Sequence, residues 1–234
     1  MGNVVIIGDS YSTFEKYIPE GYLSYYPRED SQVTSVEQTW WHQLFAATGD
    51  TVVMNSSYSG STICHTGYDG MDSRHSSFVT RLDTLLRNGF FDRVKIDDVY
   101  IFGGTNDDWA GSPLGQLTYR DWHAEDLYKV LPAVCWLIYH ATQLPGAPNV
   151  TVIINSDLRK EICSGLISAC EYWGISYVLL HDISKVNRHP DTDGMRAIKE
   201  QVWMVKCIVN AQKAVALLEE NNCRTADVVA AMEA

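Results

Sequence analysis

Short apolar runs rich in β-branched residues alternate along this chain with longer segments of helical periodicity. The apolar runs, each predicted to be a strand, are residues 3–7, 51–54, 98–102, 150–154 and 175–179. The predicted helices are residues 36–47, 76–88, 125–143, 157–173 and 194–220. This alternation predicts an α/β fold in which helices cover a parallel sheet.

The lengths of the predicted loops are asymmetric. Connections from helix to strand are short, whereas the loops 10–35, 55–75 and 103–124, which all follow strands, are long. Parallel strands present their carboxyl ends at one edge of the sheet, where open α/β sheets bind ligands. The pattern therefore predicts a functional site at that edge.

The length and composition of the chain are typical of a single globular domain. The chain has 234 residues, of which 46% are apolar, and Pro and Gly are not gathered into a linker. We therefore expect a single domain that spans residues 1–234.

The charge balance limits the partners. Lys and Arg number 18 against 29 Asp and Glu, so the formal net charge is -11. Such a field repels phosphate backbones and anionic lipids, which argues against nucleic acid and membranes as partners. A strand begins within three residues of Met1, with no leader pattern before it, so we expect a cytoplasmic protein; the sequence does not indicate its oligomeric state.

The six cysteines include no Cys-x-x-Cys pair and several lie in helical patterns. Reduced, mostly buried thiols are expected, rather than a disulfide framework or a zinc site. No metal and no cofactor is expected.

Ser10 follows the first predicted strand in the sequence Gly8-Asp9-Ser10 and is a candidate nucleophile. A serine hydroxyl needs a base to remove its proton, and histidine is the usual one. His189 lies after the fifth predicted strand, in a turn with Pro190, and would reach the same edge. The backbone amides of Ser10 and Gly60 and the side chain of Asn106 are suitable donors for the oxyanion of an acyl transfer.

These segments occur in the order of the sequence blocks of a known family. With Gly8-Asp9-Ser10, Gly60, Asn106 and His189 in place, the chain resembles the SGNH hydrolases, also called GDSL-type esterases, over residues 8–194. The resemblance implies a three-layer α/β/α sandwich with a flavodoxin-like five-stranded parallel sheet. It also implies a metal-independent serine esterase, with Ser10 as nucleophile, His189 as base and an oxyanion hole formed by Ser10, Gly60 and Asn106.

One position departs from the family pattern. The family usually has Asp three residues before the histidine, where this chain has Val186. Asp182 is the nearest upstream carboxylate and is our candidate for the third member of a triad. A backbone carbonyl that orients His189 is the alternative.

The long loops are rich in aromatic residues, which suit the walls of a sugar or acyl site but also pack loops onto a sheet. We take Tyr11, Tyr58 and Trp109 as candidate substrate-binding residues. The expected substrate is a small ester with a short acyl group such as acetyl, on a carbohydrate or another small molecule. The alternatives are a thioesterase or lysophospholipase of the same family, and a noncatalytic carbohydrate-binding module that has lost its triad carboxylate.

Overall fold

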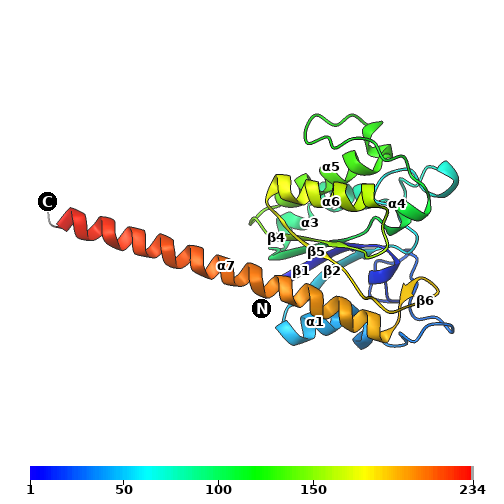
Figure 1. Ribbon diagram of the computed structural model, residues 1–234, viewed down its shortest axis with the longest axis horizontal. Coiled ribbons are helices and arrows are strands. Elements are labelled where there is room, and N and C mark those ends of the chain that lie inside the picture. Colours follow the sequence, from blue (N-terminus) through cyan, green and yellow to red (C-terminus); the bar gives the residue numbers. More distant parts are fainter. Residues whose placement is uncertain (233–234) are drawn as a thin grey trace.

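A five-stranded parallel sheet forms the centre of the molecule. The computed structural model describes the backbone of residues 1–232 and the side chains of residues 1–216 and 218. The strands are β1 (Asn3–Gly8), β2 (Thr51–Ser57), β3 (Asp98–Phe102), β4 (Asn149–Ile154) and β5 (Ser176–Leu179). Their order across the sheet is β2-β1-β3-β4-β5 (Figure 1), the flavodoxin-like arrangement. The predicted fold class is confirmed.

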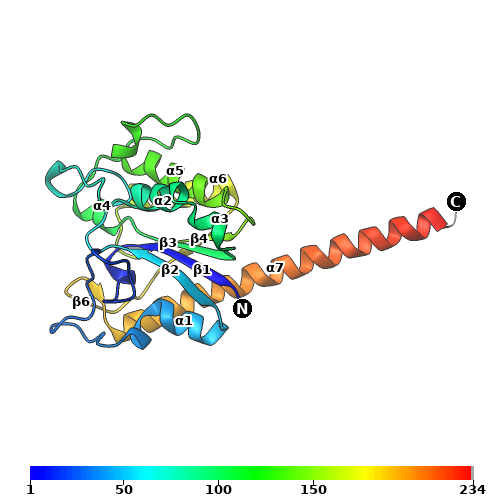
Figure 2. The same ribbon diagram turned by 180° about the vertical axis from the view of Figure 1, so that it is seen from behind.

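Helices cover both faces of the sheet, so the molecule has three layers (Figure 2). One face packs against α1 (Trp40–Thr48) and α7 (Thr192–Met232). The helices on the opposite face are α2 (Phe78–Arg87), α3 (Phe90–Arg93), α5 (Val130–Thr142) and α6 (Lys160–Trp173). The short helix α4 (Thr105–Trp109) follows β3 directly.

The side chains of β1 show how the strands link the two layers. Val5 and Ile7 belong to the core beneath α2, α5 and α6, whereas Val4 and Ile6 belong to the core beneath α1 and α7. All four are fully buried, and each contributes roughly 1.5–3 kcal/mol on leaving water. Burial on both sides explains why the strands read as continuous apolar runs rather than as alternating patterns.

Two predicted helices start later in the structure than the sequence pattern suggests. The segment 36–47 begins with a separate 3₁₀ turn, Val36–Gln38, capped by Ser35, and α1 starts only after the N-cap Thr39. The segment 125–143 likewise begins with a 3₁₀ turn, and α5 starts at Val130. Helical periodicity runs through these turns because a 3₁₀ turn places its side chains nearly as an α-helix does.

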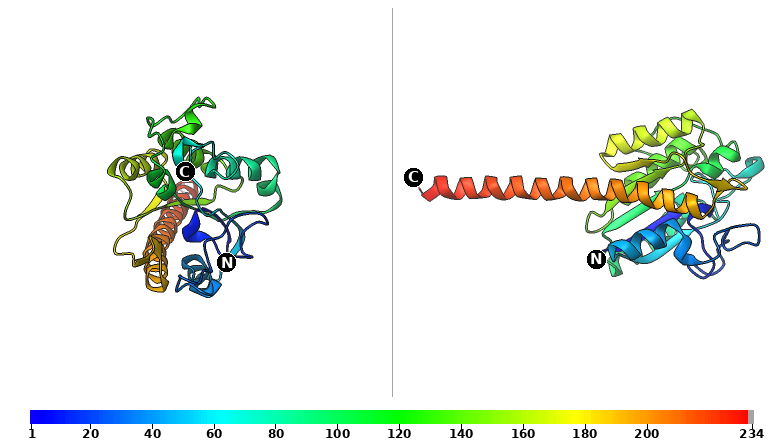
Figure 3. Two further views of the ribbon diagram at one scale, coloured as in Figure 1. Left: turned by 90° about the vertical axis from the view of Figure 1, so that its right-hand side faces the viewer. Right: turned by 60° about the horizontal axis from the view of Figure 1, so that its bottom comes forward.

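Helix α7 is longer than the predicted 194–220. Its first part packs on the sheet through Met195, Ile198 and Val202. Further along, Lys206 and Lys213 still bond to strand residues, and the last part projects away from the other elements (Figure 3). Within residues 1–232, no helix combines the length and apolar character that crossing a bilayer requires.

Candidate active site

Ser10 lies where β1 ends. The Oδ1 atom of Asp9 accepts a hydrogen bond from the amide of Tyr11, and Ser10 begins the 3₁₀ turn Ser10–Ser12. At Gly8, a Cβ atom would lie 2.6 Å from Ser57 Oγ and 2.8 Å from Ser12 Cβ, so only glycine fits. The close packing of this strand end holds the Ser10 hydroxyl at the carboxyl edge of the sheet.

His189 belongs to a small hairpin at the same edge (Figure 1). Strands β6 (Lys185–Val186) and β7 (His189–Pro190) are antiparallel, and Asn187 and Arg188 form the turn between them. Both turn residues have positive φ angles, 50° and 65°, as in a type I′ turn. The hairpin turns the imidazole toward β1.

The imidazole of His189 joins the Ser10 hydroxyl to a backbone carbonyl. Its Nε2 atom is 2.9 Å from Ser10 Oγ, and its Nδ1 atom is 3.0 Å from the carbonyl oxygen of Asn187. A carbonyl can only accept, so Nδ1 carries the ring proton and Nε2 accepts from the Ser10 hydroxyl. This is the tautomer that a general base requires.

Aromatic rings surround this imidazole. The Tyr25 ring stacks on it with centroids 3.5 Å apart and an interplanar angle of 7°. Tyr11 and Trp109 approach it edgewise, with centroids at 5.4 and 6.0 Å. Tyr25, from the first long loop, therefore restrains the plane of the ring.

Hydrogen bonds from distant residues hold the hairpin. The Tyr11 hydroxyl donates to the carbonyl of Arg188, and the Tyr26 hydroxyl donates to that of Pro190 at 2.7 Å. At the base of the hairpin, Asp191 accepts from the Ser184 hydroxyl at 2.6 Å. The position of His189 thus depends on the loop that follows β1.

The surroundings lower the pKa of His189 below its ordinary value of 6.5. Burial is the main cause, and the cations Arg28 and Lys185 act in the same direction. The hydrogen bond to the Asn187 carbonyl opposes the shift. The imidazole is consequently neutral at pH 7 and free to accept a proton.

The structure does not bring Asp182 to His189. The Asp182 side chain is 95% exposed, and its carboxylate bonds to His181 Nδ1 at 3.0 Å. The Asn187 carbonyl occupies the Nδ1 side of His189 instead. The reason is the tight hairpin, which places the carbonyl two residues before the histidine against its own ring.

The two other predicted oxyanion donors are tied to each other and to β1. Gly60 has a φ angle of 81° in the turn after β2. The carbonyl of the next residue, Ser61, accepts from Asn106 Nδ2 at 3.0 Å, and the Tyr68 hydroxyl donates to Asn106 Oδ1 at 2.8 Å. These contacts define the orientation of the Asn106 amide and leave its second N–H for a ligand. The Gly8 carbonyl accepts from the Tyr58 amide at 3.1 Å, which ties this turn to β1.

Arg81 is a buried cation beneath this arrangement that the sequence analysis missed. Its guanidinium donates to the Gly8 carbonyl at 2.9 Å, to Ser61 Oγ at 3.1 Å and to the Ser76 carbonyl at 2.8 Å. The side chain is only 2% exposed, and burial lowers its pKa to about 10. Arg81 thus fastens the end of β1 to the Gly60 turn. Its position in an amphipathic helix carries no signal of this role.

Two buried carboxyls flank the site. The Asp107 carboxylate accepts from the amides of Ile63 and Cys64, at 2.8 and 3.1 Å, and burial raises its pKa to about 6. Burial likewise raises the pKa of Asp9 to about 7. Within the part of the chain that the structure describes, no cluster of three or more His, Cys, Asp or Glu is arranged to hold a metal ion.

The candidate substrate-binding aromatics occupy different environments. Tyr11 is 1% exposed and packs on Phe102, so its ring supports the site rather than lining it, contrary to expectation. The burial follows from its place in the turn directly behind Ser10. Tyr58 is half-buried against Tyr22, whereas Trp109 lies beside His189.

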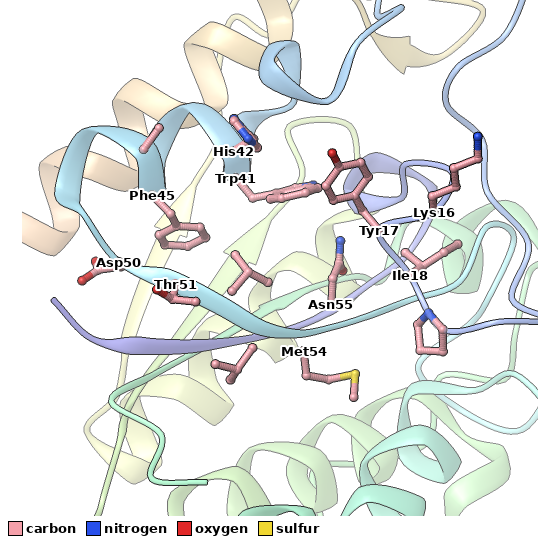
Figure 4. Close-up of a pocket in the computed structure, with 14 residues that line it drawn as sticks. Lys16, Tyr17, Ile18, Trp41, His42, Phe45, Asp50, Thr51, Met54 and Asn55 are labelled. Carbon is pink, nitrogen blue, oxygen red and sulfur yellow. The ribbon is translucent and has the colours of Figure 1, made fainter.

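A cavity of about 630 Å³ lies elsewhere, beside the edge strand β2 (Figure 4). Its lining includes Tyr17, Trp41, Phe45 and residues 50–55. Neither Ser10 nor His189 lines it. The cavity is therefore separate from the candidate active site.

Comparison with known proteins identifies the class. The GDSL-like Lipase/Acylhydrolase family matches residues 2–206, and the chain belongs to this family, whose members hydrolyse esters. Crystal structures described as GDSL-like lipases from Bacteroides uniformis and Bacteroides ovatus are each 40% identical, with a TM-score of 0.81. The alignments cover 87% of this chain and 94% and 97% of those chains.

A more distant structure shares the fold. It is an aryl esterase from M. smegmatis, 15% identical with a TM-score of 0.59, and the alignment covers 88% of this chain and all of that one. No curated protein matches the chain. The resemblance to GDSL-type esterases noted in the sequence is confirmed.

Proposed function

We propose that this protein is a serine esterase that hydrolyses carboxylic esters through an acyl-enzyme. The observation that carries the proposal is the 2.9 Å contact between Ser10 Oγ and His189 Nε2, with the opposite ring nitrogen bonded to the Asn187 carbonyl. This geometry supports transfer of the serine proton to the histidine.

The first half of the reaction acylates Ser10. Its Oγ attacks the ester carbonyl carbon while the hydroxyl proton moves to His189 Nε2. The carbonyl π electrons pass to the oxygen, which the amides of Ser10 and Gly60 and the free N–H of Asn106 stabilise. The C–O bond to the alcohol then breaks, and the leaving oxygen takes the proton from Nε2.

The second half releases the acyl group. Water attacks the acyl-serine carbonyl and gives a proton to Nε2. As the tetrahedral intermediate collapses to the acid, the bond between the carbonyl carbon and Ser10 Oγ breaks and Oγ takes the proton back from Nε2, which restores the free enzyme. Throughout, the Asn187 carbonyl holds the tautomer as a triad carboxylate would, but with only a partial negative charge. The neutral imidazole, with its lowered pKa, is ready to act at neutral pH.

For the substrate, we propose a short acyl group, such as acetyl, on a carbohydrate or another small molecule. The rings of Tyr25 and Trp109 beside His189 support this assignment, since aromatic rings bind sugars and small acyl groups.

Nitrophenyl esters of increasing acyl length test the proposal. We expect the highest kcat/KM on the acetate, and at least a 1000-fold lower kcat for Ser10→Ala and His189→Ala. A fluorophosphonate should add one adduct to the wild type and none to Ser10→Ala, by intact mass. Equal labelling of both proteins would contradict the proposal, and a preference for long acyl chains would indicate a lipase or lysophospholipase instead.

A further inference from the structure

Arg188, the residue before His189, carries an unpaired charge at the active site. Its guanidinium lies over the Trp109 ring, 5.4 Å from the centroid, and the side chain is exposed. Trp109 is in turn 6.0 Å from the His189 ring. Among the side chains that the structure describes, no carboxylate or other acceptor bonds to the Arg188 guanidinium.

The other cations near His189 each have a carboxylate partner. Arg28 pairs with Asp30 at 2.9 Å, and Lys185 pairs with Asp157. Arg188 therefore leaves a local positive charge on a chain whose formal net charge is -11. An anion approaching this protein meets attraction here against a repulsive background.

The backbone of Arg188 is held in an unfavourable conformation. Its φ angle of 65° is in the left-handed region, where glycine is the usual residue of a type I′ turn. The Tyr11 hydroxyl donates to the Arg188 carbonyl and so helps to hold the backbone of the turn in this conformation. A residue other than glycine in such a conformation, next to the proposed catalytic histidine, points to a role for its side chain.

The charge of Arg188 also acts on the oxyanion side of the site. Burial raises the pKa of Tyr68, and the Arg188 cation opposes that rise. Tyr68 is the residue whose hydroxyl donates to Asn106 Oδ1. The cation on the residue next to the proposed base thus also acts on the tyrosine that binds a proposed oxyanion donor.

We propose that Arg188 binds a carboxylate carried by the substrate, so that the preferred substrates are anionic esters. The inference rests on the proposed serine esterase function and narrows its substrate class. Trp109 covers one face of the guanidinium and leaves the N–H groups at its edge to bind a carboxylate. A charge-assisted hydrogen bond of this kind is worth about tenfold or more in affinity.

Two matched pairs of esters test this proposal. 4-Nitrophenyl hemisuccinate against 4-nitrophenyl butyrate places the charge on the acyl side, and 4-acetoxybenzoate against its methyl ester places it on the alcohol side. For each pair, the measured quantity is the kcat/KM of the anionic ester divided by that of the neutral ester. In at least one pair, Arg188→Met should lower this ratio about tenfold, mainly by raising the KM of the anionic ester. Raising NaCl to 0.5 M should lower the wild-type ratio in the same direction.

Arg87→Met is the matched control. It removes the same charge from α2, where Arg87 is exposed and pairs with Asp83, and the anionic-to-neutral ratio should stay at the wild-type value. Arg188→Lys keeps the charge but lacks the planar guanidinium that can bind a carboxylate through two N–H groups, and it should give an intermediate ratio.

Two results would overturn the inference: an unchanged ratio in both pairs, or an equal loss on all four esters, which would assign Arg188 to the oxyanion or to the hairpin. A wild type that hydrolyses none of the four and takes no fluorophosphonate label would refute the esterase proposal itself, and the inference would fall with it.

Discussion

At the scale of single residues, the chemistry of His189 depends on groups that are not acidic. The Asn187 carbonyl sets its tautomer, and Tyr25 restrains its plane. Neither group adds a full negative charge that would stabilise the imidazolium, while Arg28 and Lys185 disfavour it. The proposed base is therefore weak but correctly oriented, and it stays neutral to a lower pH than an ordinary histidine.

The pH profile should report this environment. Only neutral His189 can accept the serine proton, and its pKa is below the ordinary 6.5. As the pH falls, kcat/KM on 4-nitrophenyl acetate should therefore stay constant until below pH 6.5 and decline only there. An acid limb centred above pH 6.5 would contradict the burial of the ring as the dominant influence.

Removal of the stacked ring should change both rate and pH profile. Tyr25→Ala should lower kcat/KM by between about tenfold and 100-fold because the imidazole can rotate out of line. It should also move the acid limb to higher pH, since loss of the ring lets water reach His189 and raises its pKa. Tyr25→Phe keeps the stack and should behave as the wild type; if it were as impaired as Tyr25→Ala, the hydroxyl rather than the ring would be responsible.

At the scale of secondary-structure elements, the site depends on connections between strand ends. Arg81, on α2, binds both the carboxyl end of β1 and the turn that follows β2. The β6–β7 hairpin is fastened by hydroxyls of Tyr11 and Tyr26, from the loop after β1. The relative positions of Ser10, the Gly60 turn and His189 are thus set by a few buried polar contacts.

Arg81 and Arg87, on the same helix, make a matched pair. Arg81→Met leaves the Gly8 carbonyl without its cation and should lower the free energy of unfolding by about 3 kcal/mol. Arg87→Met removes an exposed pair and should change it by less than about 0.5 kcal/mol. Urea unfolding, followed by tryptophan fluorescence, measures the free energy of unfolding of both variants. Equal losses would show that the buried contacts of Arg81 add no stability beyond that of an exposed arginine.

At the scale of the whole molecule, α7 covers one face of the sheet. It is bound to the edge of the sheet at which the strands begin, and the candidate active site lies at the other edge. Lys206 on α7 binds Asp98 of β3 at 2.7 Å and Asp50, just before β2, at 3.1 Å. These three side chains are largely buried. Lys206 therefore joins the helical layer to two strands near their amino ends.

Loss of this link should reduce stability without altering the chemistry of the site. Lys206→Met leaves the carboxylates of Asp50 and Asp98 close together without a cation and should lower the free energy of unfolding by about 2 kcal/mol. The kcat on 4-nitrophenyl acetate should remain near the wild-type value, since the site is at the other edge. A large drop in kcat at full stability would show that α7 couples to the active site.

The sequence by itself determined the strands, their parallel arrangement and the residues at their carboxyl ends. β-Branched runs such as 98–102 report local backbone preference and burial, and parallel topology then places Ser10, Gly60 and Asn106 at one edge. Family membership also followed from these short motifs, because they lie at the ends of strands whose positions the pattern predicts.

Only the tertiary structure decided what surrounds His189. Every residue has a backbone carbonyl, so a sequence cannot single out that of Asn187 as the group that orients His189. The nearest upstream carboxylate, that of Asp182, lies exposed beside His181 instead. Tyr25 and Arg81 reach the site from loops and helices whose paths depend on packing between segments far apart in the chain. Local patterns encode secondary structure, whereas such contacts exist only once the layers have assembled.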